Sequence, residues 1–173
     1  MPDIRMRLRD DCEIDSYINR PLDDLATFNR HVDPLRAKLN EISILVDGRE
    51  RFISESGYQK AMEAIESFEP NLIIIKTPRD GRILGALSFS QRKDFDKIWI
   101  EYMGVLFNRQ GLGTELIKEI SKIALRERKS LWVETDTCEG KAFFHKKIGM
   151  RKVNRDPYGF YFTIDKINQF LNQ

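Results

Sequence analysis

The chain has 173 residues, of which 41% are hydrophobic and 32% are charged, and its formal net charge is +2. No repeat, low-complexity tract or Pro/Gly/Ser-rich linker interrupts it, so we predict a single domain over residues 1–173. Two cysteines, Cys12 and Cys138, exclude a disulfide framework. Apolar runs such as 72–75 are too short to span a bilayer, and charged residues stand where a signal peptide is apolar. We therefore expect a cytoplasmic protein with no membrane partner.

Charge is distributed unevenly along the chain. Residues 1–70 contain ten Lys and Arg against fifteen Asp and Glu, whereas residues 71–173 contain nineteen against twelve. Two interpretations are open: the acidic part attracts a cationic ligand and the basic part a polyanionic one, or both are solvated surfaces. Basic residues are not clustered with aromatic residues into a nucleic-acid motif, so we expect no nucleic-acid partner.

The first seventy residues predict a strand followed by helices. Ile4, Met6 and Leu8 alternate with arginines, which predicts a half-buried strand. Pro21 and Pro34 are both suited to the first position of a helix, and apolar residues at helical spacing follow each, so we predict two helices there. A further helix is expected over residues 56–68, before Pro70.

The next segment predicts three strands. Residues 71–76 and 82–90 are apolar runs joined by Pro-Arg-Asp-Gly, which predicts a β-hairpin that turns at Gly81. Residues 97–107 predict a fourth strand. Within it, Gly104 is compatible with a β-bulge or with a gap for a large neighbour, and both interpretations are open.

A glycine-spaced turn then leads into a long helix. The stretch Val105 to Thr114 reads Val-Leu-Phe-Asn-Arg-Gln-Gly-Leu-Gly-Thr, and an apolar stripe from Leu112 to Ala124 predicts an amphipathic helix. Gly111 and Gly113 would let the backbone turn sharply, and the first turn of the helix would offer unpaired N–H groups and the positive end of its dipole. The sequence therefore predicts an anion-binding turn. The alternative is that the two glycines only allow the chain to turn between the strand and the helix.

Two nucleotide-binding motifs fit this turn poorly. A dinucleotide site needs a third glycine, and a triphosphate loop needs Gly-Lys-Ser/Thr, which the sequence lacks here. The residues Asn-Arg-Gln-Gly-Leu-Gly instead resemble the pyrophosphate motif Gln/Arg-x-x-Gly-x-Gly/Ala of the GNAT superfamily of acyl-CoA-dependent N-acyltransferases. Asn108 departs from the motif at its first position. An unrelated α/β nucleotide binder remains an alternative.

The following residues extend this resemblance. Residues 130–136 resemble the fifth strand of that family, residues 142–150 resemble its Phe-Tyr-x-x-x-Gly-Phe helix end, and residues 159–165 resemble its closing strand. His145 occupies the position of the family's tyrosine. The resemblance covers roughly residues 71–165, which would form an acetyl-CoA-binding core, while residues 1–70 would form a variable substrate side without a family signature.

The resemblance implies an α/β (α+β) fold: a mixed, twisted sheet of about seven strands, flanked by helices and splayed between strands 4 and 5. It implies acetyl-CoA as cofactor, bound by the fourth strand, the glycine turn and a wall residue beyond the fifth strand. The residues expected to contact the cofactor are Met103, Val105, Phe107, Asn108, Arg109, Gln110, Gly111, Leu112, Gly113, Thr114 and Cys138.

Three side chains are candidates for the chemistry. An amine must lose a proton before it attacks, and Glu134 or Glu101 could accept that proton, with Glu134 slightly favoured because its position resembles the glutamate of N-terminal protein acetyltransferases. His145 could protonate the departing thiolate in place of the family's tyrosine. Each of the three could equally be an ordinary surface residue, and a backbone N–H near Val105 would meet the oxyanion.

We therefore predict an N-acetyltransferase that transfers an acetyl group to a primary amine by direct attack in a ternary complex. No metal is expected; the acceptor would be a small molecule or a peptide, and a homodimer is compatible with the sequence. The alternative is a GNAT-fold protein that binds acyl-CoA without catalysis, as a sensor or interaction module; the off-pattern Asn108 and His145 support it.

Overall fold

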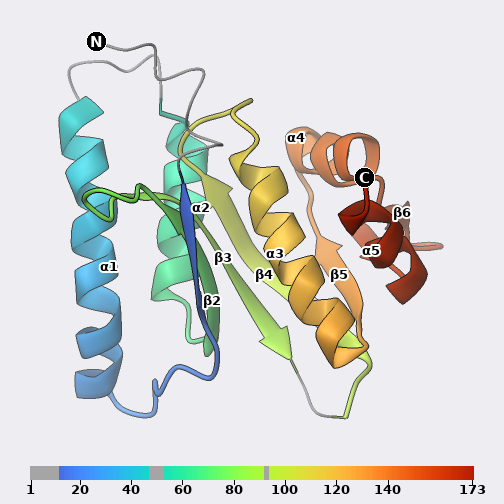
Figure 1. Ribbon diagram of the computed structural model, residues 1–173, viewed down its shortest axis with the longest axis horizontal. Coiled ribbons are helices and arrows are strands. Elements are labelled where there is room, and N and C mark those ends of the chain that lie inside the picture. Colours follow the sequence, from blue (N-terminus) through green and yellow to red (C-terminus); the bar gives the residue numbers. More distant parts are fainter. Residues whose placement is uncertain (1–11, 47–52, 92–93) are drawn as a thin grey trace. The chain divides into compact units, whose positions relative to one another are not determined.

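The computed structural model describes residues 12–46, 53–91 and 94–173 of the chain (Figure 1). The element order is β1 (Glu13–Tyr17), α1 (Leu25–Val46), α2 (Glu55–Glu66), β2 (Asn71–Lys76), β3 (Ile83–Gln91), β4 (Lys97–Val105), α3 (Leu112–Glu127), β5 (Ser130–Glu134), α4 (Cys138–Lys141), η2 (Ala142–Ile148), β6 (Arg151–Lys152), β7 (Gly159–Phe162) and α5 (Ile164–Leu171). None of the helices within these residues is long and apolar enough to cross a membrane.

The strands form one hydrogen-bonded sheet in the order β1-β2-β3-β4-β5-β7-β6. β1 with β2, β2 with β3, β5 with β7 and β6 with β7 are antiparallel, while β4 and β5 are parallel. This mixed sheet confirms the predicted fold class. The parallel pairing ends at Ile100 and Val133, whereas β4 continues to Val105.

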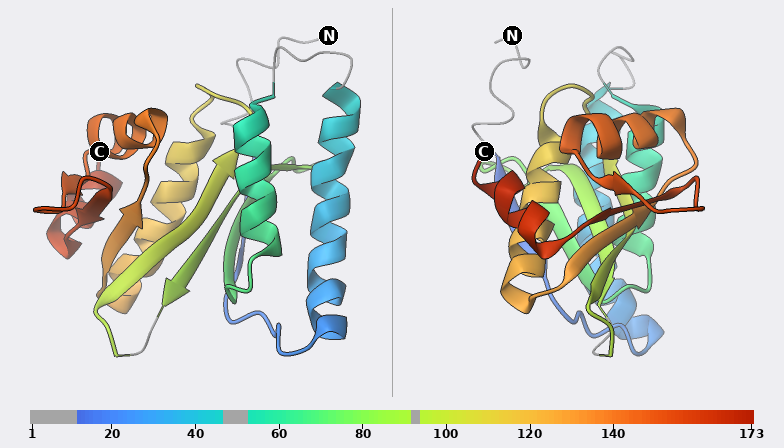
Figure 2. Two further views of the ribbon diagram at one scale, coloured as in Figure 1. Left: turned by 180° about the vertical axis from the view of Figure 1, so that it is seen from behind. Right: turned by 90° about the vertical axis from the view of Figure 1, so that its right-hand side faces the viewer.

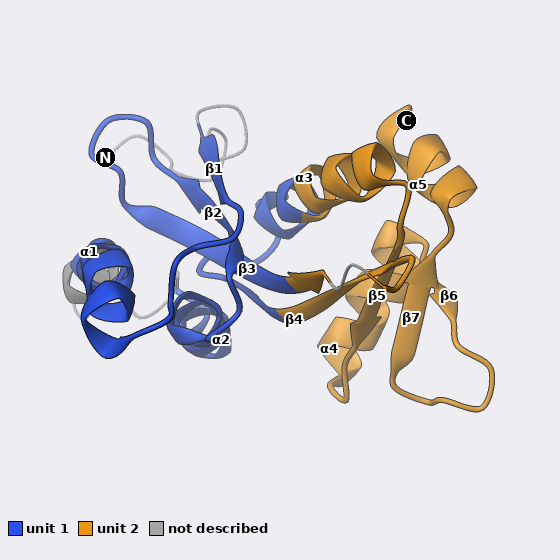
Figure 3. Cartoon of the chain, turned by 90° about the horizontal axis from the view of Figure 1, so that it is seen from below, with its two compact units in different colours: residues 1–89, 102–116 blue, residues 90–101, 117–173 orange. Residues whose placement is uncertain are grey.

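The chain divides into two compact units, coloured blue and orange in Figure 3. Unit 1 comprises residues 1–89 and 102–116, and unit 2 comprises residues 90–101 and 117–173. β4 and α3 each contribute residues to both units. The organisation of residues 1–173 as one domain stays a prediction.

In unit 1, α1 is one helix where two were predicted. The predicted helix start at Pro21 is wrong because Asp24 caps the helix: its carboxylate accepts the N–H of Thr27 at 2.8 Å. Pro34 lies inside α1 and does not begin a second helix. Val32 and Leu39, on either side of this proline, are completely buried. Continuous packing across Pro34 offsets the loss of one helical hydrogen bond.

The rest of unit 1 largely follows the prediction. α2 begins after Ser54, whose hydroxyl accepts the N–H of Gly57 at 3.0 Å, and lies side by side with α1 (Figure 2). β2 and β3 form the expected hairpin, and Gly81 turns it with a φ of 67°. The strand predicted at residues 4–8 lies outside the described residues, so β1 is the first described strand.

The core of unit 1 is built on β2 and β3. Residues 71–75 of β2 and 83–89 of β3 are all buried, so both faces of this hairpin are covered. Strands that are buried on both faces appear in a sequence as continuous apolar runs, without the alternation of apolar and polar residues that a half-buried strand shows. Both faces of this hairpin therefore belong to the core of unit 1.

Unit 2 ends differently from the prediction. The closing strand was expected over residues 159–165, but β7 ends at Phe162, and α5 follows. Thr163 is the reason, because its hydroxyl accepts the N–H of Lys166 at 3.4 Å as the N-cap of α5. Phe170 of α5 then packs on Phe162, with ring centroids 5.5 Å apart.

Candidate functional site

The glycine turn forms as an irregular loop between β4 and α3. Gly111 has a φ of 77°, in the left-handed region that glycine adopts most easily, so it turns the chain as predicted. Arg109 also adopts a positive φ, 61°, which the sequence did not indicate. Gly113 differs from the expectation: it is buried in the first turn of α3 and has no positive φ, so only one of the two glycines turns the chain.

The start of α3 has the polar groups that an anion needs. The first intrahelical bond runs from the N–H of Glu115 to the carbonyl of Gly111, at 3.1 Å. The N–H groups of Leu112, Gly113 and Thr114 precede that bond and have no carbonyl one helical turn earlier to accept them. The Thr114 hydroxyl is buried and has no hydrogen-bond partner. Helix-end donors and an unsatisfied hydroxyl therefore lie within one turn, beside the exposed Asn108 and Arg109 and the half-buried Gln110.

The end of β4 presents its backbone on two sides. The N–H of Leu106 donates to the carbonyl of Leu84 in β3, at 2.8 Å. Because the N–H groups of successive residues in a strand point in opposite directions, the N–H of Val105 is directed away from β3. Val105 and its predicted neighbours Met103 and Phe107 are half-buried.

Gly104 is explained by close packing on α2. A Cβ atom on Gly104 would collide with the carbonyl oxygen of Gly57, and one on Gly57 would collide with the carbonyl oxygen of Val105. Two glycines thus let α2 approach the backbone of β4. The packing interpretation of Gly104 therefore holds, although its neighbour is a helix backbone and not a large side chain.

Unit 2 brings the two candidate bases together. The last residues paired between β4 and β5 are Ile100 and Val133, and Glu101 and Glu134 are the next residue in each strand. Both glutamates are exposed, and by alternation both side chains lie on the face opposite Ile100 and Val133. The hydroxyl of Ser90 donates to the carboxylate of Glu101 at 2.6 Å.

A row of aromatic residues precedes these glutamates, and the sequence analysis missed it. Trp99, Trp132 and Tyr161 are direct partners across β4, β5 and β7, with ring centroids 5.4 and 5.0 Å apart. The ammonium of Lys97 lies 4.0 Å from the centroid of a Trp132 ring. Only the strand register shows that these residues, far apart in sequence, form one row. The row stabilises the pairing of the strands close to the positions of Glu101 and Glu134.

His145 is held on a helix with π geometry, which ends at Gly149 with a φ of 88°. Its Nδ1 lies 2.9 Å from the carbonyl oxygen of Met150. A carbonyl only accepts hydrogen bonds, so Nδ1 carries a proton and Nε2 is the nitrogen that can gain and lose one. The ring also lies 6.2 Å from that of Phe160, a residue paired with Val133, so His145 reaches this strand end from the face opposite Glu134.

Cys138 begins the short helix α4 and is an exposed, free thiol. Thr137 caps this helix by accepting the N–H of Gly140 at 3.0 Å. Within the described ranges, no group of three or more His, Cys, Asp or Glu side chains could hold a metal ion.

Comparison with known proteins identifies the family. Residues 41–150 match the acetyltransferase (GNAT) family, which is more than half of the chain. The match includes residues 41–70, where no family signature was expected, and it leaves residues 1–40 outside. No curated protein matches the chain.

Solved structures agree on the fold. A mutant of the AtaT toxin, bound to the C-terminus of the antitoxin AtaR and acetyl-CoA, is 16% identical with a TM-score of 0.55; the match covers 95% of this chain and 100% of that one. The catalytic domain of the Tetrahymena GCN5 histone acetyltransferase, in complex with coenzyme A, is 15% identical with a TM-score of 0.53, covering 88% and 93%. A KacTA–DNA complex is 16% identical with a TM-score of 0.54, covering 69% and 86%. With its mixed sheet, its glycine turn and this family match, the chain belongs to the GNAT family of acetyltransferases.

Proposed function

We propose that this protein is an N-acetyltransferase that transfers an acetyl group from acetyl-CoA to a primary amine by direct attack in a ternary complex. The observation that carries the proposal is the end of the pairing between β4 and β5 at Ile100 and Val133. The candidate bases Glu101 and Glu134 are the next residues in these two strands. Similar folds were solved with acetyl-CoA or coenzyme A bound.

The turn before α3 fits the phosphates of such a cofactor. Helix N-termini bind phosphate through unpaired N–H groups and the helix dipole. In this chain, the left-handed conformations of Arg109 and Gly111 precede that helix end, and the unsatisfied hydroxyl of Thr114 follows. We therefore assign phosphate binding to residues 108–114, and pantetheine and acetyl binding to Met103, Val105, Phe107 and Cys138.

Bound acetyl-CoA supplies an activated acetyl group and a thiolate leaving group. Glu134, or alternatively Glu101, accepts the proton of the acceptor ammonium, whose ordinary pKa is near 10.4. The N–H of Val105, directed away from β3, donates to the developing oxyanion. His145 donates a proton from Nε2 while Met150 fixes its orientation through Nδ1. The candidate acid and the candidate bases lie on opposite faces of β5.

A thiol-release assay with acetyl-CoA and a panel of primary amines tests this proposal. We expect saturable release of free thiol with at least one amine. Cofactor binding is tested by thermal melting: acetyl-CoA at a hundredfold over its dissociation constant adds about 2.7 kcal/mol of stability. Gly111→Val, which forces a bulky residue into a left-handed conformation, is expected to abolish this gain while the protein stays folded.

The second candidate is an acyl-CoA-binding sensor without transferase activity. Two observations favour it: Asn108 stands at the first motif position, and His145 replaces the tyrosine of the family. This candidate predicts the stabilisation by acetyl-CoA, and its loss in Gly111→Val, without thiol release for any amine. One protein of similar fold was solved in a complex with DNA, so binding of this protein to DNA should be measured beside the thiol-release assay.

A further inference from the structure

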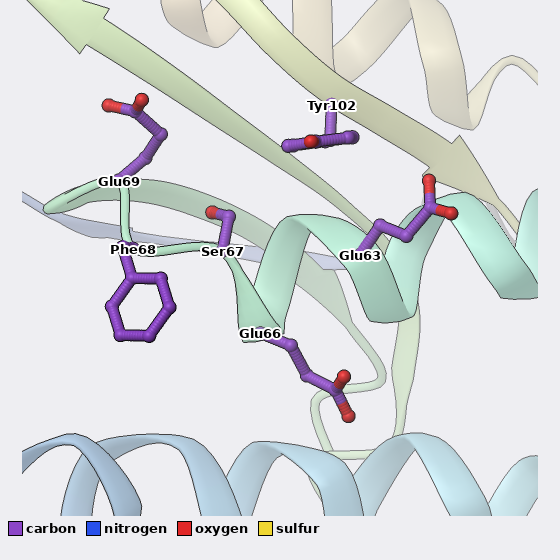
Figure 4. Close-up of a pocket in the computed structure, with 6 residues that line it drawn as sticks. All are labelled: Glu63, Glu66, Ser67, Phe68, Glu69 and Tyr102. Carbon is purple, nitrogen blue, oxygen red and sulfur yellow. The ribbon is translucent and has the colours of Figure 1, made fainter. Parts of the chain in front are cut away.

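A pocket of about 450 Å³ lies within unit 1, beside the end of α2. Its lining combines carboxylates and aromatic rings: Glu63, Glu66, Ser67, Phe68, Glu69 and Tyr102. Figure 4 shows Glu63 and Glu69 on the same side of the segment as Tyr102, whereas Glu66 and Phe68 turn towards α1. The end of α2 is therefore lined by a carboxylate and an aromatic ring on each of two sides.

Two arginines of unit 1 hold this segment in place. Arg20, only 5% exposed, donates from Nη1 to the carbonyl of Ile65 at 3.4 Å and from Nη2 to the carbonyl of Glu69 at 2.9 Å. Arg36 of α1 donates to the carboxylate of Glu66 at 2.8 Å. The segment that carries the carboxylates is thus ordered before any partner arrives, which lowers the entropic cost of binding.

Tyr102 provides an exposed ring beside these carboxylates. Gly104 and Leu106, at the next alternate positions of the chain, are buried, but Tyr102 is 44% exposed. The face of a tyrosine ring attracts cations, and a guanidinium group can stack on such a ring while it donates two hydrogen bonds to a carboxylate. An ammonium group lacks the planar fork that this arrangement uses. This side of the pocket is therefore suited to an arginine side chain.

An exposed apolar patch continues the pocket at the start of α1. Phe68 is 78% exposed, and its ring packs on that of Phe28 with the centroids 5.0 Å apart. Leu25, which is 74% exposed, lies three residues before Phe28 and therefore on the same side of α1. Among the described residues, Phe68 and Leu25 are the two most exposed large apolar side chains. Their position at one end of unit 1 indicates a surface that a partner covers.

We propose that the pocket and this patch together bind a segment of a partner protein that carries an arginine close to a large apolar residue. Tyr102 and Glu63 receive the guanidinium group, and Leu25 and Phe68 receive the apolar side chain. Charge favours a basic partner, because residues 1–70 contain fifteen Asp and Glu against ten Lys and Arg. A small cation would leave the apolar patch uncovered. The surface lies in unit 1 alone, and its use does not depend on the proposed transferase function.

Fluorescence anisotropy with a labelled synthetic peptide tests this surface in the absence of acetyl-CoA. The probe has three Gly-Arg-Ser-Leu repeats, which offer arginine and leucine at several separations, and its N-terminus is blocked by the fluorophore. It contains no primary amine, so its binding cannot be that of an acetyl acceptor. We expect one site, with a dissociation constant about tenfold higher for probes in which glutamine replaces each arginine or serine replaces each leucine.

Substitutions in the protein separate a built site from general attraction to an acidic surface. We expect Glu63→Gln, Tyr102→Leu and Leu25→Ser each to raise the dissociation constant of the probe about fivefold to tenfold. Tyr102→Leu and Leu25→Ser leave the charge of the protein unchanged. The matched controls lie in unit 2: Glu127→Gln at an exposed helical glutamate, and Ile164→Ser at the exposed first residue of a helix.

Three results would overturn the inference. The first is equal binding of the probe by wild type, the three variants of the surface and the two controls. The second is binding of arginine amide as tight as that of the probe and insensitive to Leu25→Ser, which would assign the pocket to a small cation. The third is a wild-type dimer in sedimentation velocity that Leu25→Ser dissociates, which would assign the patch to a second copy of this chain.

Discussion

The two compact units contain different kinds of candidate functional residue. In unit 1, the candidate cofactor residues act largely through backbone: a loop with left-handed residues, the N-terminus of α3 and the end of β4, where α2 packs on glycine. In unit 2, the candidates Glu101, Glu134 and His145 act through exposed side chains. A binding site made of backbone groups depends on the conformation of its segment. An exposed side chain, in contrast, can be replaced without unfolding the protein. We therefore expect substitutions in unit 2 to lower the rate of transfer, and glycine or cap substitutions in unit 1 to lower stability or cofactor binding.

The largest expected effect is that of Glu134→Gln. Glutamine keeps the size of the side chain but cannot accept the proton of the ammonium, so we expect kcat to fall about 10³-fold, within the range of general-base losses. Glu134 is exposed at the end of β5, and the melting temperature should change little. Glu101→Gln is the matched variant, since Glu101 is the adjacent exposed glutamate. A larger loss in Glu101→Gln would exchange the two roles, and near wild-type kcat in both would remove the base from unit 2.

A smaller loss of rate, about 10²-fold in kcat, is expected for His145→Phe. As a general acid, the histidine must carry the proton that it donates, so we expect the rate to fall at high pH and the variant to lose this descending limb. His145→Tyr should recover activity and move the limb towards pH 10, near the ordinary pKa of tyrosine. The measurement is the pH profile of kcat under conditions where thiolate departure limits turnover. Unchanged turnover in His145→Phe would show that His145 is a surface residue without a catalytic role. The candidate bases would then be the remaining catalytic candidates in unit 2.

Local sequence signals predicted much of this molecule. The runs of β2 and β3, the stripe of α3 and the glycine turn were recognised because their signals lie within a few neighbouring residues. Gly111 was recognised because few other residues adopt its conformation easily. The same local reasoning failed at Pro34, where burial of Val32 and Leu39 keeps the helix continuous.

The features that were missed depend on contacts between distant segments. The row of Trp99, Trp132 and Tyr161 exists only once the strand register is known. The pocket beside Tyr102 requires the end of α2 to meet β4, which the sequence does not show. The π geometry around His145 and the bond to Met150 likewise follow from packing. The sequence therefore names candidate side chains, while their common faces and partners come from the fold.

A moderate loss of stability in unit 1 is expected for Gly57→Ala. Alanine normally stabilises a helix relative to glycine by 0.5–1 kcal/mol, but a Cβ at Gly57 would collide with the carbonyl oxygen of Val105. We expect the free energy of unfolding to fall by about 2 kcal/mol, the cost of overpacking a close contact. Gln59→Ala, at an exposed position of the same helix, is the control and should leave stability nearly unchanged. A stabilised Gly57→Ala protein would show that α2 does not depend on this approach.

The smallest expected effect is that of Ser54→Ala. This substitution removes the side-chain N-cap of α2 but preserves the backbone hydrogen bond from Ser54 to Leu106. The hydroxyl of Ser54 accepts the N–H of Gly57 at 3.0 Å, whereas its backbone N–H donates to the carbonyl of Leu106 at 2.7 Å. Alanine loses the first bond and keeps the second. We therefore expect the free energy of unfolding, measured in urea, to fall by about 1 kcal/mol, and the affinity for acetyl-CoA to stay unchanged. Ser54→Asp retains a capping oxygen and should stay close to wild type. A loss of acetyl-CoA affinity in Ser54→Ala, restored in Ser54→Asp, would show that the side-chain cap also positions the loop, and that stability and binding in unit 1 cannot be separated.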